Sequence, residues 1–488
     1  MGHDGVVPLR RVIVGAVVAV LVVGPLLGLL ALWRAADRAE AAAAELDARF
    51  LAASPAPLES GTVAVLNARR LPDELTESMA DRALGQRLQA LGANLPPTSC
   101  LVVAVDGRTL VSLRPTDPLV PASLEKLATA TAVLDHMRPD ERLATRVATN
   151  AEVVDGVVMG DVWLVGGGDP LLATPEYAGQ AERQPQVRTP FEDLSLGLVE
   201  AGIVAIEGRV FGDDGRYDSQ RNVASWPGHY IPSGVVGPLT ALSVDDGFVP
   251  AGPEEYMAAS DPAQAAAQRL STDLTTLGVA VAGEPRSGPV PPDTTVLAEV
   301  LSPPVDGILA QLLRESDNNT AELLAKELGL RLAGIGTTDA GTQVVAAALS
   351  QRHPAPVLHT VVDGSGLDRG NRLTCQIVHG LVVASPAGSV IADGLAVAGR
   401  TGTLTNRFLQ SPLAGLLRAK TGSLSGVRGL AGYAATPAGT ITFAEILNGL
   451  PEADAVADGF QDQLVAELST YPERPPVQSV EPPAVARQ

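Results

Sequence analysis

Two residues near the first quarter of the chain have the types and the spacing that nucleophilic catalysis needs. Ser123 and Lys126 lie three residues apart in the segment PASLEKLATATAVL. On a helix this spacing puts both side chains on one face, so that the Lys126 amine can reach the Ser123 hydroxyl. Serine is a weak nucleophile unless a neighbouring base takes its proton. The pair therefore predicts a serine nucleophile with a lysine base.

Lysine is rare in this sequence, because only three of the 35 basic residues are lysine: Lys126, Lys326 and Lys420. Arginine stays protonated and cannot act as a base, whereas a lysine can if burial or a nearby cation lowers its pKa. Lowering a lysine pKa from about 10.4 to roughly 7–8 corresponds to about 4 kcal/mol, which the site must supply. Taken alone, S-x-x-K is more typical of a surface lysine one turn from an N-cap serine. We interpret Lys326, on the other hand, as solvated.

A second segment, ESDNN, falls between two helical patterns. Ser316 and Asn318 are two residues apart and can both point at one cleft. Ser, Asp and Asn also suit helix caps, so an ordinary polar turn between helices is the alternative.

A third segment, Lys420-Thr421-Gly422, lies in a run typical of a β-strand. An amine and a hydroxyl there can hold a carboxylate, and a glycine lets a ligand approach the backbone. The alternative is an exposed lysine at a strand end. A similar segment, RTGT at residues 400–403, has arginine in place of lysine, and we interpret it as structural.

The surrounding patterns predict mixed α and β elements. Apolar residues at helical spacing predict a buried helix that begins near Ser123 and helices over 305–315 and 319–334. Residues 100–113 predict a β-hairpin with Asp106-Gly107 at its turn, and the runs after residue 415 predict adjacent antiparallel strands before a closing helix over 452–468. Short strand-like runs with intervening helices predict an inserted domain, or a pair of subdomains, over 145–290.

The two ends of the chain have a different composition. Arg10 and Arg11 precede 22 uncharged, mostly apolar residues, 12–33, which as a helix would be roughly 33 Å long and span a bilayer. We interpret residues 1–34 as a cytoplasmic tip and membrane anchor with the body outside. A cleavable signal stays an alternative. Residues 35–60 predict an Ala-rich stalk and linker, and 471–488 a Pro-rich disordered tail.

Charge and cysteine content limit the function further. The 488-residue chain has a formal net charge of −20, which argues against a nucleic-acid partner. Cys100 and Cys375 could form one disulfide in an exported protein, or remain two buried thiols. The six histidines include no metal-binding pair, so we expect no metal and no other cofactor. The VGGGDP segment lacks the G-K-[ST] ending of a phosphate loop.

S-x-x-K, S-D-N and K-T-G in this order are the signature of the penicillin-recognising serine acyl-transferases. Within that superfamily the sequence most resembles the D-alanyl-D-alanine carboxypeptidases/endopeptidases of the penicillin-binding protein 4 type, peptidase family S13. The resemblance covers roughly residues 60–470. The separation of 193 positions from Ser123 to Ser316 fits the large insertion of that family, whereas class A β-lactamases are more compact there. The resemblance rests on the segments PASLEKLATATAVL, VWLVGGGDPLL, ESDNNTAELLAKELG, VVDGSGLDRGNRLT, GTLTNRF and GLLRAKTGSLSGVRGLAGY.

The resemblance implies an α/β (α+β) protein. Residues 61–144 and 291–470 would form a β-lactamase/transpeptidase-like domain, an antiparallel sheet flanked by helices, with the inserted domain and the N-terminal transmembrane helix added to it.

The resemblance also implies a role for each motif residue. Ser123 would attack the carbonyl between two terminal D-alanines with Lys126 as base, and Ser316 would relay a proton to the leaving group. Backbone N–H groups of Ser123 and Ser423 would form the oxyanion hole.

The remaining motif residues would bind substrate, and they are Asn318, Lys420, Thr421, Gly422 and Ser423. Asn318 would bind the substrate amide, Lys420 would help lower the Lys126 pKa, and Thr421 and Ser423 would hold the terminal carboxylate. Arg369 is a candidate contact for the stem peptide, and Trp226 and Tyr230 are candidates to reach over the cleft.

The expected function is a serine D-Ala-D-Ala carboxypeptidase that acts on peptidoglycan stem peptides and is acylated by β-lactams. It would be anchored in the bacterial cell membrane with its catalytic domain outside, or secreted if the N-terminal segment is cleaved. Two alternatives are a β-lactamase-like hydrolase and a non-catalytic wall-binding protein. The sequence does not separate carboxypeptidase from endopeptidase action.

Overall fold

The computed structural model describes residues 71–181, 183, 187–252, 255–353, 358–450 and 455–473, all within one compact unit. The predicted anchor over 12–33, the stalk, and the tail from residue 474 onward lie outside the described residues. Within the described ranges no helix is both long and apolar enough to cross a membrane.

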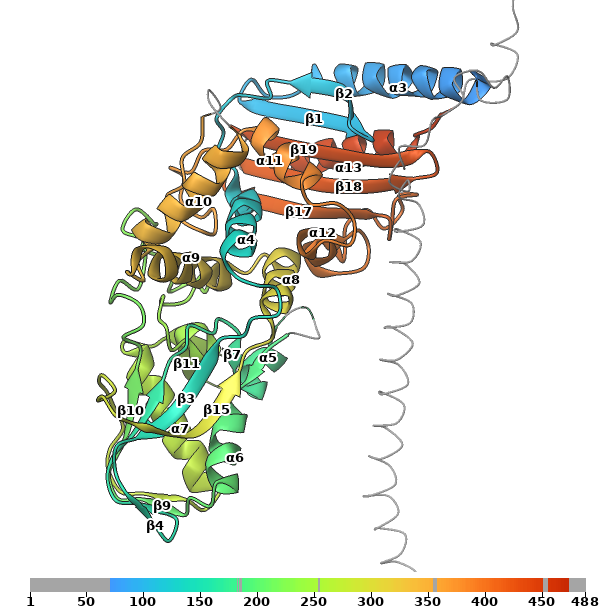
Figure 1. The fold of residues 1–488 in the computed structure, drawn as a ribbon. Helices are drawn as coiled ribbons and strands as arrows, with labels where there is room; N and C mark the ends of the chain where they lie inside the picture. The colour runs from blue at the N-terminus through green and yellow to red at the C-terminus, as the bar shows by residue number, and fades with distance from the viewer. Residues whose placement is uncertain are drawn as a thin grey trace, which may run out of the picture. The chain divides into compact units, whose positions relative to one another are not determined.

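A six-stranded antiparallel sheet with helices on both faces carries the strand order β16-β17-β18-β19-β1-β2 (Figure 1). Its strands are β1 (Ser99–Val105), β2 (Arg108–Leu113), β16 (Ala396–Val397), β17 (Leu417–Leu424), β18 (Val427–Thr436) and β19 (Gly439–Asn448). The predicted hairpin is confirmed, because β1 pairs with β2 across Asp106 and Gly107, which both have positive φ. β1 also pairs with β19, so a strand from early in the chain joins three from its end.

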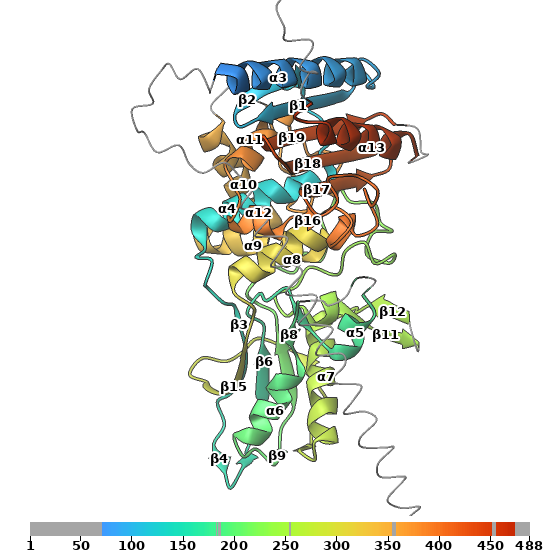
Figure 2. The ribbon, with the colours of Figure 1, turned by 90° about the vertical axis from the view of Figure 1, so that its right-hand side faces the viewer.

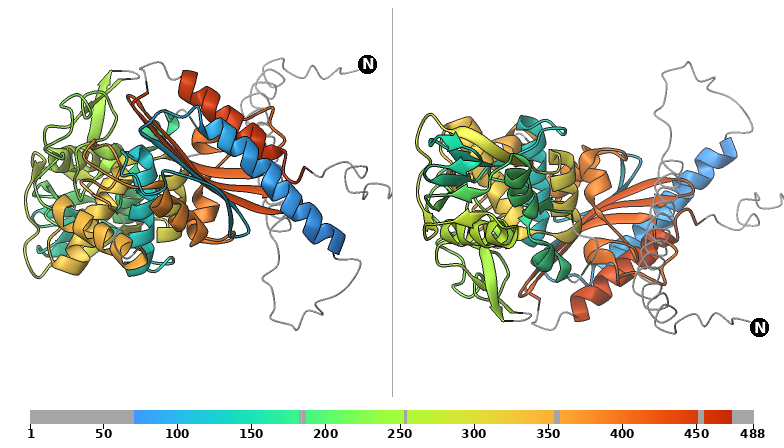
Figure 3. Two further views of the ribbon diagram at one scale, coloured as in Figure 1. Left: turned by 90° about the horizontal axis from the view of Figure 1, so that it is seen from above. Right: turned by 90° about the horizontal axis from the view of Figure 1, so that it is seen from below.

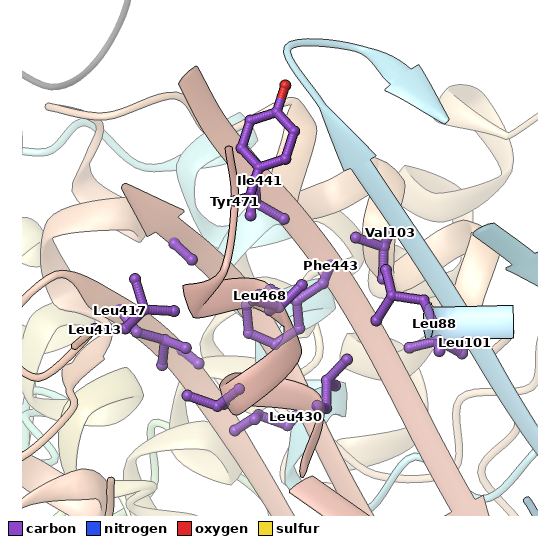
Figure 4. Close-up of a cluster of buried hydrophobic side chains, with 14 of the residues drawn as sticks. Leu88, Leu101, Val103, Leu413, Leu417, Leu430, Ile441, Phe443, Leu468 and Tyr471 are labelled. Atoms are coloured by element: carbon purple, nitrogen blue, oxygen red, sulfur yellow. The ribbon is translucent and has the colours of Figure 1, made fainter. Parts of the chain in front are cut away.

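Helices cover both faces of this sheet. On one face α3 (Leu71–Gly92) and α13 (Ala455–Ser469) lie alongside each other, as Figure 3 shows. Their apolar side chains close a core with the sheet, in which Leu88, Phe443 and Leu468 are fully buried (Figure 4). On the other face α11 (Cys375–Val383) contacts β1, β18 and β19. The helix α4 (Glu125–His136) packs against α11.

Three further helices pack against α4: α8 (Val305–Glu315), α9 (Asn318–Ala333) and α10 (Thr338–Arg352). The predicted helices over 305–315 and 319–334 are thus confirmed, as is the closing helix. Every residue of α9 from Asn319 to Gly329 is buried, because α4, α8 and α10 all contact it.

The insertion builds sheets of its own (Figure 2). The largest has the order β14-β10-β6-β3-β15 and mixes parallel and antiparallel pairs. Its core is closed by α6 (Glu192–Glu200) and α7 (Pro262–Thr276). Its strands are β3 (Ala144–Thr149), β6 (Val162–Val165), β10 (Val210–Asp213), β14 (Arg286–Ser287) and β15 (Thr295–Leu301).

The predicted end of the insertion at residue 290 is too early. Strand β15, Thr295–Leu301, pairs with β3 along its length and not with any strand of the six-stranded sheet. After Leu301 the chain returns to the helices beside the six-stranded sheet, where Pro304 precedes α8. The proline-rich segment at 289–293 therefore connects two strands of the inserted region.

The remaining elements are short. They are β4 (Val153–Val154), β5 (Val157–Val158), β7 (Leu172–Ala173), β8 (Thr189–Pro190), β9 (Ala205–Ile206), β11 (Phe248–Gly252), β12 (Glu255–Ala258), β13 (Ala280–Val281), α5 (Pro175–Gly179), α12 (Val390–Gly394), and the 3₁₀ helices η2 (Ala122–Leu124), η3 (Val244–Gly247) and η4 (Gly402–Leu404).

A disulfide joins Cys100 on β1 to Cys375, the first residue of α11. Both residues are fully buried. Of the two alternatives for the cysteines, the structure contains the bonded one, which ties α11 to the central sheet.

Candidate active site

The first motif lies where η2 passes into α4. Pro121 precedes η2, which carries Ser123, and α4 begins at Glu125, so the predicted buried helix is confirmed. Lys126 follows Ser123 by one turn, and the Lys126 Nζ is 3.0 Å from the Ser123 Oγ. Lys126 has 0% of its surface exposed, so the surface-lysine alternative is excluded.

The second motif is the break between α8 and α9. Ser316 ends α8 in the left-handed conformation (φ 63°), and the Asp317 side chain caps α9 by accepting from the Thr320 N–H. Asn318 begins α9 and accepts a 2.7 Å hydrogen bond from the Lys126 Nζ at its Oδ1. Its Nδ2 donates to the Val235 carbonyl at 2.7 Å, which fixes the orientation of the amide.

The third motif lies on β17, the strand next to η2. The Lys420 Nζ donates to the Ser316 Oγ at 2.8 Å and to the Thr421 carbonyl at the same distance. A Cβ on Gly422 would lie 2.9 Å from the Pro121 carbonyl oxygen. The glycine therefore lets β17 approach the segment that carries the nucleophile.

The three motifs meet at one cleft of about 590 Å³. The cleft is lined by Asn318 and by the four hydroxyl residues predicted for the site: Ser123, Ser316, Thr421 and Ser423. Tyr230 and Arg369 also line the cleft, as expected for candidates to contact a peptide. Trp226 does not line it. Instead its Nε1 donates to the buried Asp363 carboxylate at 2.8 Å.

Thr403 also lines this cleft, and the sequence analysis missed it. The Thr421 Oγ1 donates to the Thr403 Oγ1 at 2.8 Å. Thr403 belongs to RTGT, which we had interpreted as structural. The signal that could have found it is the repetition in RTGT of the Thr-Gly pair of the third motif, since two such segments can present hydroxyls to one ligand.

Burial controls the charge of both motif lysines. Desolvation lowers the pKa of Lys126 to about 8, although the carboxylates of Asp363, Glu322, Asp317 and Glu125 oppose this shift. Lys420 is also 0% exposed, and burial followed by repulsion from Lys126 lowers its pKa well below the usual value. A free amine at Lys126 is therefore accessible near neutral pH. Burial is what lowers the pKa of Lys126, and the repulsion between the two amines acts on the pKa of Lys420.

The prediction for Lys326 is wrong, because its side chain is fully buried and not solvated. Its Nζ donates to Asp218 and, at 3.0 Å, to the Gln220 carbonyl. Asp218 and Gln220 belong to the segment that leads to the cleft residues Tyr230 and Val235. Lys326 thus attaches this segment to α9.

The described residues contain no group of three or more His, Cys, Asp or Glu side chains arranged to hold a metal ion.

Comparison with known proteins identifies the family. Residues 89–255 and 251–471 match the sequence profile of the D-Ala-D-Ala carboxypeptidase 3 (S13) family. The chain belongs to this family. The match includes all three motifs, so the resemblance described above is confirmed.

Curated relatives have the same assignment. The chain is 28% identical over 451 residues to a D-alanyl-D-alanine carboxypeptidase from Actinomadura, a match that covers 76% of this chain and 81% of the relative. It is 32% identical over 348 residues to the carboxypeptidase DacB of Mycolicibacterium smegmatis, covering 68% of this chain and 72% of the relative. This S13 family member is thus a serine-type carboxypeptidase.

Solved structures share its fold. Penicillin-binding protein 4 (dacB) from Haemophilus influenzae superposes with a TM-score of 0.67 at 21% identity, over 79% of this chain and 99% of that one. The same protein in complex with a β-lactam superposes with a TM-score of 0.59 at 20% identity, over 79% and 99%. The mixed α/β fold with an antiparallel sheet and a large insertion is therefore the fold of penicillin-binding protein 4.

Proposed function

We propose that Ser123 is the nucleophile and Lys126 the general base with which this carboxypeptidase removes the terminal D-alanine from peptidoglycan stem peptides. The Ser123 Oγ attacks the carbonyl carbon between the two D-alanines and its proton passes to the Lys126 Nζ. The C–N bond then breaks, an ester to Ser123 remains, and the departing amine takes up a proton. Water hydrolyses the ester and restores the Ser123 hydroxyl.

The observation that carries this proposal is the set of partners around the Lys126 amine. A neutral amine has two N–H donors and one lone pair. The Asn318 Oδ1 and the Ser365 carbonyl oxygen each lie 2.7 Å from the Nζ, and both can only accept. These two acceptors take both N–H groups, so the lone pair is left for the Ser123 hydroxyl, 3.0 Å away. A base in this orientation is ready to remove the proton.

The rest of the cleft supports the other roles. Ser316 bonds to Lys420 and can relay a proton to the leaving amine, since its hydroxyl both donates and accepts. Thr421 and Ser423 line the cleft with hydroxyls that suit the terminal carboxylate. The backbone N–H groups of Ser123 and Ser423 are our candidates for the oxyanion hole.

Labelling with a fluorescent penicillin tests the nucleophile directly. Wild-type protein should become covalently labelled, and Ser123→Ala should not. An unlabelled wild type would favour a non-catalytic wall-binding protein, and a labelled Ser123→Ala variant would show that the nucleophile is another residue.

Substrate assays then separate the enzyme classes. We expect release of D-alanine from a pentapeptide ending in D-Ala-D-Ala. Rapid penicillin turnover without peptide cleavage would identify a β-lactamase instead. Cleavage of a cross-linked peptide dimer would add endopeptidase action.

We also propose that the catalytic domain works outside the cytoplasm, held by residues 12–33. The charge bias around this apolar stretch and the peptidoglycan substrate support that location. Mass spectrometry of the protein purified from membranes tests it: an intact N-terminus supports the anchor, and loss of residues 12–33 shows that they are a cleaved signal.

A further inference from the structure

The segment DGSG, residues 363–366, runs through a narrow gap between η2 and α9. A Cβ on Gly366 would lie 1.9 Å from the Ala122 carbonyl oxygen, and Gly366 has a φ of +84°. A Cβ on Gly364 would lie 2.7 Å from a carbonyl oxygen of α9. The two glycines let the backbone pass this close, and they bring the carbonyl of Ser365 within 2.7 Å of the catalytic amine.

Glu322 holds this segment from the side of α9. Its Oε1 accepts a 2.7 Å hydrogen bond from the backbone N–H of Ser365, and its side chain is fully buried. Glu322 follows Asn318 by four residues, so the two side chains lie on one face of the helix. The helix therefore reaches the Lys126 amine twice, directly through Asn318 and indirectly through Ser365.

Glu322 is one of three buried carboxylates near Lys126. The Asp363 carboxylate accepts from Trp226 and from the Gly366 N–H, so it fixes the other side of the segment. The Glu125 oxygens have no hydrogen-bond partner in the described part of the chain. Of these three, only Glu322 bonds to the residue whose carbonyl bonds to Lys126. A buried carboxylate costs free energy, so packing alone does not account for an acid here.

We propose that Glu322 is a positioning residue for acylation: by holding the Ser365 N–H it keeps the Ser365 carbonyl on the Lys126 amine, so that the lone pair of the amine faces Ser123. This inference rests on the proposed role of Lys126 as the base. If the carboxylate withdraws, the Ser365 carbonyl moves, and the amine can turn its lone pair away from the hydroxyl. The binding of the substrate in the cleft is not affected, since Glu322 does not line it.

Three substitutions of Glu322 test the proposal by the rate of acylation with a fluorescent penicillin. Glu322→Asp keeps a carboxylate but withdraws it by one methylene, roughly 1.5 Å. Glu322→Met fills the space without an acceptor, and Glu322→Gln keeps an acceptor at the original reach. We expect the acylation rate constant to fall roughly tenfold or more in the Asp and Met variants and to stay within about threefold of wild type in the Gln variant.

The dissociation constant of the complex that precedes acylation should change less than threefold in all three variants, because a positioning residue acts on the chemical step and not on binding. Glu445→Asp is the matched control. Glu445 is fully buried on β19 and accepts a 2.9 Å hydrogen bond from Gln461 on α13, on the face of the sheet covered by α3 and α13. It should acylate at the wild-type rate. Thermal unfolding identifies any variant that does not fold. If Glu322→Met does not fold, the acylation rate of Glu322→Asp decides the test.

Acylation of Glu322→Asp within twofold of the wild-type rate would overturn the proposal. So would a Glu322→Gln variant that loses as much as the Asp variant, since the charge and not the hydrogen bond would then matter. Failure of the proposed function looks different: the wild type itself would not be labelled, or Ser123→Ala would be.

Discussion

Replacement of Lys126 by arginine separates the charge of this residue from its ability to lose a proton. Both side chains are cationic, and both can donate to the Asn318 Oδ1 and the Ser365 carbonyl. Only lysine can become a free base near neutral pH, because the guanidinium pKa stays above about 12. If Lys126 merely supplied positive charge, Lys126→Arg would be mild.

The size of the expected loss follows from the fraction of free base. With the Lys126 pKa lowered to about 8, roughly one molecule in ten carries the free amine at pH 7. For arginine the fraction is about 10⁻⁵ or less. The acylation rate should therefore fall about 10⁴-fold, which corresponds to ~5 kcal/mol in the activation free energy.

Stopped-flow labelling with a fluorescent penicillin at pH 7 measures this loss. Lys326→Arg is the matched control, because Lys326 is equally buried but bonds to Asp218 and not to a hydroxyl. It should acylate within about threefold of wild type. Arginine is larger than lysine, and overpacking can cost about 1–3 kcal/mol of stability, which thermal unfolding of both variants will measure. A folded Lys126→Arg protein that acylates within tenfold of wild type would refute the general-base assignment.

Three further outcomes are expected. The acylation rate constant should rise with pH and level off above about pH 8, since Lys126 is protonated and inactive below its pKa; a rate constant that stays flat between pH 6 and 9 would contradict this. Ser316→Gly should lower the acylation rate roughly 100-fold, because it removes the Oγ. It should not lower the melting temperature, because glycine suits the left-handed φ of 63° better than serine does. A lower melting temperature together with the slower acylation would point to a structural role for Ser316. The double variant Cys100→Ala/Cys375→Ala should lose about 2–5 kcal/mol of unfolding free energy, because the disulfide closes a chain segment with a sequence separation of 275. Its acylation at 25 °C should stay within twofold of wild type, and a larger loss would show that α11 positions the cleft.

The sequence predicted the site well where local geometry decides it. The spacing of Ser123 and Lys126 on a helix fixes their contact, and the break between two helical patterns places Ser316 and Asn318 at one helix junction. The β-strand that carries Lys420 followed from β-rich runs separated by turns at SLSG and TPAG. In each case the determining neighbours lie within a few residues along the chain.

The sequence failed where the determining neighbours are distant. Lys326 lies outside the three motifs, where a lone charged side chain suits solvent, but it is buried and its Nζ donates to Asp218, more than 100 residues earlier. Thr403 joins the cleft only because η4 lies beside β17 in the folded chain. Strand β15 follows a proline-rich segment typical of a domain boundary, and only its pairing with β3 shows that the boundary comes later. Such contacts depend on tertiary packing, which composition and periodicity do not record.

The three lysines show how partners decide what a rare residue does. All three are fully buried, so the scarcity of lysine in an arginine-rich chain marks burial and does not by itself mark catalysis. Lys326 bonds to a carboxylate and a carbonyl, and an ion pair of this kind holds two segments together. Lys126 bonds to two neutral carbonyl oxygens and a hydroxyl, so its neighbours within hydrogen-bond distance include no carboxylate that would require the ammonium form. Lys126 differs from Lys420, whose amine also has no carboxylate partner among the described residues, in that its hydroxyl partner is the proposed nucleophile Ser123.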